Sequence, residues 1–137
     1  MSQILALDYG LKRVGIAVTD DLQIIASGLT TIPTKEIFKF LDNYLQSVKV
    51  ELFLVGAPKQ MDYTVSESEK HIIPFVKKLK SKFSDIPVQR IDERFTSKIA
   101  FQTMIDSGLK KKQRQNKALI DEISATIILQ SYLYNKK

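Results

Sequence analysis

Two short apolar runs constrain the fold of this 137-residue chain more than any other feature. The first run, Gln3 to Asp8, is apolar up to its last residue, and the second, Glu51 to Gly56, reads ELFLVG. Uninterrupted apolar runs of this length are typical of strands that are buried on both faces. The sequence therefore predicts a sheet that other elements cover on both sides.

Changes in hydrophobic period predict the remaining elements. Strand-like runs at Val14 to Thr19 and Ile24 to Ile32 follow a glycine-bearing turn at Tyr9 to Arg13, so we expect an antiparallel meander of three strands. Further along, the pattern predicts a helix that begins at the candidate N-cap Thr34 and ends near Val48. A second helix is expected over Ser66 to Phe83, kinked or split at Pro74. A strand over Ile86 to Ile91 and helices over Thr96 to Ser107 and Lys117 to Tyr134 complete the chain. The order β-β-β-α-β-α-β-α-α predicts one α/β domain over residues 1–137, with a five-stranded mixed sheet and helices on both faces.

Small residues in the second strand and in the last helix indicate where elements should pack closely. Gly15 and Ala17 occupy one face of the second strand, while Val14, Ile16 and Val18 occupy the other. Small side chains on a strand let another element approach it closely. We therefore expect another element to pack closely against the face that carries Gly15 and Ala17. The small residues Ser124 and Ala125 would likewise let the last helix approach the sheet closely.

Composition and charge narrow the class of partner. The chain has 21 Lys and Arg against 15 Asp and Glu, a formal net charge of +6 and a sequence pI near 9.5. This excess favours an anionic partner, with nucleic acid the first expectation. The absence of cysteine excludes disulfides and thiolate metal sites, and it fits a reducing compartment. With no signal-peptide pattern and no membrane-spanning apolar stretch, a cytoplasmic protein is expected.

Acidic residues follow the predicted buried strands. Asp8 ends the first strand, and Asp92 and Glu93 follow the fifth. The carboxyl ends of parallel strands meet at one edge of a sheet, where open α/β sheets bind ligands. Asp121 heads a stripe on the last helix that should face the core, while Glu122 is expected to be a solvated neighbour. The other members of the stripe are Ser124, Ala125, Ile128 and Tyr132.

Three carboxylates on separate elements suit Mg²⁺ or Mn²⁺ better than Zn²⁺, because the chain has no Cys and a single His, His71. Such carboxylates can hold two metal ions that promote phosphodiester hydrolysis. Nearby cations would then contact the phosphate backbone of a nucleic acid. These cations are Arg13, Lys59, Arg94, Lys110, Lys111, Lys112 and Arg114.

Each of these features also has an ordinary structural interpretation. Asp8 could hydrogen-bond the backbone of the following turn. Asp92 could form a surface ion pair with Arg94, and Asp121 could complement the dipole of its helix. The tract at residues 110–114 could be a solvated loop.

Four segments in order resemble the motifs of one family. They are LDYGLKRVGIAV, LVGAPKQMD, DERFTS and IDEISATIILQSYL. They resemble, in turn, the Asp-x-Gly-x-x-Arg-x-Gly motif, the Val-Gly-Leu-Pro…Met-Asp loop, the Asp-Glu-Arg-Leu-Thr-Thr motif and the Asp-containing final helix of the YqgF/RuvX-type family. That family comprises pre-16S rRNA nucleases and Holliday-junction-resolvase-like proteins, and the resemblance extends over nearly the whole chain.

The resemblance implies an RNase H-like fold and a set of site residues. Asp8, Glu93 and Asp121 match the family's catalytic acids, which would hold Mg²⁺ or Mn²⁺. Asp92 is an alternative to Glu93, because adjacent strand residues point to opposite faces. Asp62 could be an accessory group.

The implied function is a metal-dependent nuclease of the two-metal-ion type. Its expected substrate is structured RNA, at the 5′ end of precursor 16S rRNA, either free or within a ribosomal particle. A Holliday junction resolvase acting on DNA and a non-catalytic RNA- or ribosome-binding module are the alternatives. Ala57, where the family usually has Leu, and Tyr63, where Gly is common, change the shape of a loop and leave the acids in place.

Overall fold

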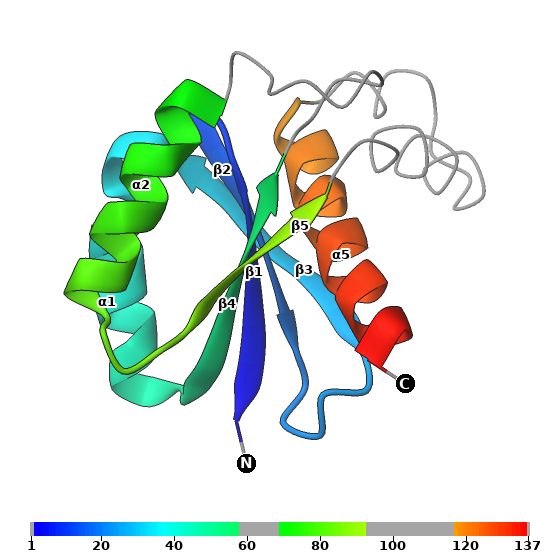
Figure 1. The fold of residues 1–137 in the computed structure, drawn as a ribbon. Helices are drawn as coiled ribbons and strands as arrows, with labels where there is room; N and C mark the ends of the chain where they lie inside the picture. Colours follow the sequence, from blue (N-terminus) through cyan, green and yellow to red (C-terminus); the bar gives the residue numbers. More distant parts are fainter. Residues whose placement is uncertain (1, 58–68, 93–116, 137) are drawn as a thin grey trace.

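The computed structural model describes residues 2–57, 69–92 and 117–136, which form a five-stranded mixed sheet with helices on both faces (Figure 1). The elements are β1 (Gln3–Tyr9), β2 (Arg13–Thr19), β3 (Ala26–Pro33), the 3-10 helix η1 (Thr34–Glu36), α1 (Ile37–Ser47), β4 (Val50–Ala57), α2 (Glu69–Lys82), β5 (Val88–Asp92) and α5 (Lys117–Lys136). No helix within these ranges is both long and apolar enough to cross a membrane.

The strand order is β3-β2-β1-β4-β5. The pairs β1–β2 and β2–β3 are antiparallel, whereas β1–β4 and β4–β5 are parallel. The predicted meander followed by parallel strands is therefore confirmed. The two uninterrupted apolar runs form β1 and β4 near the centre of the sheet, where strands are covered on both faces. The parallel strands β1, β4 and β5 end at one edge of the sheet, which we call the carboxyl edge.

Side chains of β1 alternate between two core clusters. Leu5 and Leu7 pack with α1 and α2 on one face of the sheet, which we call the α1–α2 face. Ile4 and Ala6 pack with α5 on the other, the α5 face. Each cluster combines side chains of the central strands with the apolar stripe of one or two helices. Fully buried helical members are Leu41 and Leu79 on the α1–α2 face, and Ile128 and Leu129 on the α5 face.

The small residues of β2 lie under α5, as expected. Ala17 and Ala125 are fully buried in the same cluster. On β3, a β-carbon added at Gly28 would lie 2.5 Å from Oε1 of Glu122. Glu122 is half-buried above this glycine, so the expectation that it is a solvated neighbour was wrong. The bare backbone of Gly28 leaves room for a carboxylate side chain that the helical pattern had assigned to solvent.

Thr34 is not a helix N-cap. Its hydroxyl donates to the carbonyl of Gly10 at 2.6 Å, and its N–H donates to the carbonyl of Lys12 at 3.0 Å. The chain enters η1 after Pro33, and α1 then begins at Ile37 with no side-chain cap. Because Pro33 pairs with Arg13, Thr34 lies beside the β1–β2 hairpin and binds it.

Pro74 does not split its helix. Helix α2 is continuous over Glu69–Lys82, although a proline inside a helix removes one backbone hydrogen bond. Its buried apolar stripe offsets that loss by packing on the α1–α2 face; the stripe consists of Ile72, Phe75, Val76 and Leu79. The helix expected over Thr96 to Ser107 lies outside the described residues.

Candidate active site

Asp8 lies at the carboxyl edge, one residue before the end of β1. It alternates with Ile4 and Ala6, so its half-buried side chain is on the α5 face. Gly15 of β2 is the cross-strand partner of Asp8. On the other side, Leu7 pairs with Val55 of β4, so the next residue of β4, Gly56, lies beside Asp8. Two glycines beside the carboxylate leave the sheet surface around it uncrowded.

The next residue holds the end of β1 in place. Tyr9 stacks on Phe75 of α2 with ring centroids 4.4 Å apart. Tyr9 is on the α1–α2 face, opposite to Asp8. An aromatic pair of this kind contributes on the order of 1 kcal/mol beyond its buried area. The strand end that carries Asp8 is therefore anchored from behind.

Helix α5 brings Asp121 toward the same edge. Ala125, one helical turn after Asp121, belongs to the same cluster as Ala6, two residues before Asp8. The helix runs opposite to β1 (Figure 1). The residues of α5 that precede Ala125 therefore lie nearer to the carboxyl edge, where β1, β4 and β5 end (Figure 1). The expected core-facing stripe on this helix is confirmed for Ala125, Ile128 and Tyr132.

Of the two candidates for the second acid, Glu93 and Asp92, the structure describes only Asp92. Asp92 is the last residue of β5 and pairs with Ala57, so its backbone lies at the carboxyl edge. Glu93 is outside the described residues, as are Asp62, Lys59, Arg94 and the tract at 110–114. Among the residues that the structure does describe, no three His, Cys, Asp or Glu side chains form a group that could hold a metal ion.

The β1–β2 hairpin, which follows Asp8, carries two cations. Arg13 is the half-buried first residue of β2, and Lys12 is exposed in the turn. The N–H of Gly10 donates to the carbonyl of Arg13 at 2.9 Å, and a β-carbon at Gly10 would lie 2.8 Å from that oxygen. Only glycine therefore fits at position 10, and the two hydrogen bonds from Thr34 hold the same turn in place. Lys12 is a candidate phosphate contact that the sequence analysis did not include.

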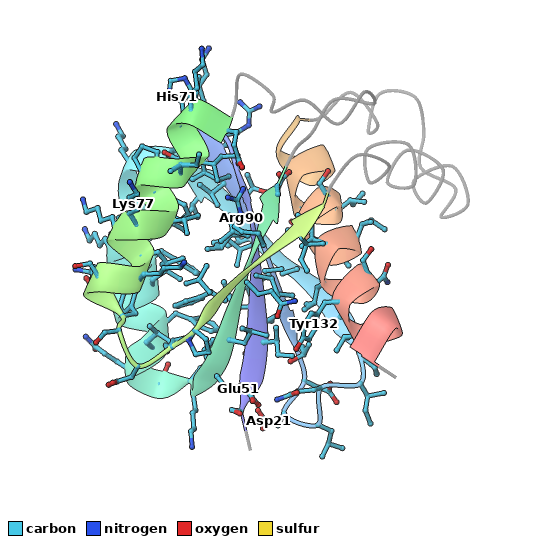
Figure 2. All side chains as sticks on the ribbon, in the orientation of Figure 1. Asp21, Glu51, His71, Lys77, Arg90 and Tyr132 are labelled. Carbon is cyan, nitrogen blue, oxygen red and sulfur yellow. The ribbon has the colours of Figure 1, made fainter. Side chains whose placement is uncertain are left out.

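Arg90 is a second residue that sequence reasoning missed. From β5 its guanidinium donates to the carbonyls of Val55 at 3.2 Å and Gly56 at 2.8 Å, and it pairs with Glu69 of α2 at 2.6 Å. The Arg90 and Glu69 side chains are 27% and 12% exposed. Figure 2 shows Arg90 between α2 and β5. The pair joins the end of β4 to the start of α2, which orders the carboxyl edge. The feature of the sequence that could have indicated this role is the presence of an arginine within a predicted strand.

We expect Arg90→Gln to lower the free energy of unfolding by about 1–3 kcal/mol, because it leaves the Glu69 carboxylate without its partner in a poorly solvated position. The matched control is Lys82→Gln. This change removes a surface ion pair with Asp42, in which the side chains are 38% and 47% exposed, and should cost at most about 1 kcal/mol. Urea denaturation measures both. Equal losses would show that the Arg90 pair does no more than a surface pair.

The fold and the edge that carries Asp8 define the class of protein. The structure aligns with Thermus thermophilus RuvC, solved in complex with a Holliday junction substrate, at a TM-score of 0.60 and 18% identity over 99% of this chain and 96% of that one. The architecture is thus RNase H-like, of the RuvC type.

Sequence relatives identify the family within that class. The family model described as "RuvX: Holliday junction resolvase" matches residues 2–135, and the chain belongs to this family. Proteins named "Putative pre-16S rRNA nuclease" are 63% identical in Christiangramia forsetii, covering 98% of this chain and 99% of the relative, and 60% identical in Bacteroides fragilis, covering 100% and 99%. The Porphyromonas gingivalis protein of that name is 52% identical, with 98% of each chain covered.

Proposed function

We propose that this protein is a metal-dependent nuclease that hydrolyses phosphodiester bonds in structured RNA, at the 5′ end of precursor 16S rRNA. The relatives at 52–63% identity carry that substrate in their names. The observation that carries the proposal is the placement of Asp8 at the carboxyl edge, on the face of the sheet against which α5 packs. The proposed unit is a single domain over residues 1–137.

Asp8, Glu93 and Asp121 are the proposed ligands of Mg²⁺ or Mn²⁺. Carboxylate donors with no cysteine suit these hard cations, and the glycines beside Asp8 leave space for them. Ile91 is on the α5 face, and residues two apart in a strand share a face, which favours Glu93 over Asp92 as the second ligand. When bound, such ions lower the pKa of a water nucleophile and stabilise the leaving oxygen.

The chain's own residues bind and orient the substrate in this proposal. Lys12 and Arg13 come from the hairpin that follows Asp8, and Gly10 and Thr34 hold its backbone in place, so these cations can bind phosphate near that strand end at little entropic cost. Phosphate contacts of this kind position a nucleic acid without reading its sequence. The edge around Asp8 would therefore select for backbone geometry and branched or folded shape.

The direct test is incubation of the purified protein with precursor rRNA and with four-way DNA junctions, with and without Mn²⁺ or Mg²⁺. Metal-dependent cleavage of the precursor near the mature 5′ end is the expected result. Cleavage of junctions alone would instead identify a DNA resolvase. Binding of RNA with no cleavage under any metal condition would identify a non-catalytic module.

The cations Lys110, Lys111, Lys112 and Arg114 are proposed to contact phosphates ahead of the helix that carries Asp121. Changing the three lysines to Gln should weaken RNA binding uniformly across sequences and reduce the slope of log K against log salt by up to about 3. Divalent-cation affinity should stay the same, since no proposed ligand is changed. An unaltered salt slope would mean that this tract is a solvated loop.

A further inference from the structure

The loop between β2 and β3, residues 20–25, presents three large apolar side chains to solvent. Leu22, Ile24 and Ile25 are 61%, 69% and 62% exposed. The loop lies at the end of the sheet opposite to the carboxyl edge (Figure 1). Single exposed apolar residues are ordinary, whereas neighbouring ones are typical of an interaction surface. We call these three residues the apolar platform.

Asp20 holds this loop in one conformation. Its Oδ1 accepts hydrogen bonds from the N–H groups of Ile24 at 2.8 Å and Ile25 at 3.0 Å. Its own N–H donates to the carbonyl of Ile25 at 3.2 Å, and its carbonyl accepts from the N–H of Gln23 at 3.0 Å. The hydrogen bonds from the N–H groups of Ile25 and Ile24 also lower the pKa of the Asp20 carboxyl.

Gln23 fastens the loop to the sheet. Its side-chain amide donates to the carbonyl of Ser2 at 3.1 Å and to the carboxylate of Glu51. It also has a φ of 59°, a conformation that is uncommon for any residue but glycine. Such a conformation costs free energy and persists where its surroundings impose it, often at functional positions. The apolar platform is therefore preorganised, which lowers the entropic cost of binding a partner.

Carboxylates border the apolar platform. Asp21 and Glu51 are both exposed and lie together at this end of the molecule (Figure 2). Asp20 lies in the same loop, so three acidic residues gather at this end of the sheet. This is the reverse of the whole chain, whose net charge is +6. An acidic border repels phosphate and attracts cationic side chains.

We propose that the apolar platform and its acidic border bind a basic protein segment that carries apolar side chains. The proposal rests on the proposed function in one respect, namely that a nuclease acting on precursor rRNA meets such segments in the proteins of the precursor particle. A second copy of this chain is a poorer occupant, because a two-fold contact through this surface would bring two acidic borders together.

The occupant can be identified by crosslinking. A photoreactive amino acid in place of Leu22, in the full chain, is incubated with purified precursor particles of the small ribosomal subunit and irradiated. The expected product joins this protein to a basic protein of the particle. A product with rRNA, a product with a second copy of this chain, or no product would each overturn the proposal.

Affinity for the same particles gives an independent measurement. The triple variant Leu22→Ser, Ile24→Ser and Ile25→Ser should bind them about 10- to 100-fold more weakly, and Asp21→Lys should also weaken binding. The matched control is Ile73→Ser, which removes an apolar side chain that is 43% exposed on α2 and should leave affinity unchanged. A triple variant that binds as tightly as the wild type would overturn the proposal.

Cleavage of protein-free precursor rRNA separates this proposal from the proposed function. The triple variant should cleave that RNA at the wild-type rate, since the platform lies far from the carboxyl edge. If the wild type does not cleave it, the proposed function fails while binding to the particle is still measured.

Discussion

Asp8→Asn is expected to lower the rate of RNA cleavage by at least about 10³-fold, the scale of losing a group that acts in the transition state. Asparagine keeps the shape of the side chain and removes the charge that would hold a divalent cation. Removing one of several acids at an edge also relieves repulsion between them. The melting temperature without metal should therefore stay the same or rise, in contrast to most substitutions at half-buried positions.

Two measurements make this test specific. Mn²⁺ should raise the melting temperature of the wild-type protein, because a ligand that binds the folded state stabilises it, and Asp8→Asn should lose that rise. Asp85→Asn, at an exposed acid in the turn before β5, is the matched control and should change neither property. Full nuclease activity in a normally folded Asp8→Asn protein would remove this residue from the mechanism.

Ala17→Leu is expected to have the second largest effect, because it acts on the contact between β2 and α5. Ala17 is fully buried against the helix, so three added carbons must push the helix outward or strain the sheet. Overpacking of this kind costs about 1–3 kcal/mol of unfolding free energy. A shift of about 1 Å in a helix that carries a proposed ligand can also cost on the order of 100-fold in activity.

The control lies on the opposite face of the same strand. Ile16→Val leaves a small cavity on the α1–α2 face and should cost about 0.5–1.5 kcal/mol. Because α5 is not disturbed, activity and Mn²⁺ affinity should remain near the wild-type values. If both variants lose stability and Ala17→Leu retains full activity, the spacing between α5 and the sheet does not control the site.

Much of the fold could be predicted because the relevant information is local. The uninterrupted apolar runs of β1 and β4 identify strands covered on both faces, and the 3.6-residue period identifies α1, α2 and α5. The same patterns placed Asp8 at the end of a buried strand and Asp121 at the head of a core-facing stripe. Those predictions needed only the periodicity of side-chain directions along each element.

Other features depend on which elements become neighbours in space. Thr34 has the residue type of an N-cap, yet its hydroxyl binds Gly10 because β3 pairs with β2 and ends beside the hairpin. Arg90 stands in a strand with no local partner, and only the parallel pairing of β5 with β4 brings its guanidinium to the carbonyls of Val55 and Gly56.

The sequence by itself determined the strand and helix pattern of the described residues, the burial of β1 and β4, and the position of Asp8 near the end of its strand. Only the tertiary structure decided that α5 packs against β1 and β2, that Glu122 lies over Gly28, and which hydrogen bonds hold the hairpin and the carboxyl edge. The physical reason is the range of the interactions. Periodic burial is encoded within a few residues, whereas register and interlayer contact follow from how close-packed elements fit together across the whole core.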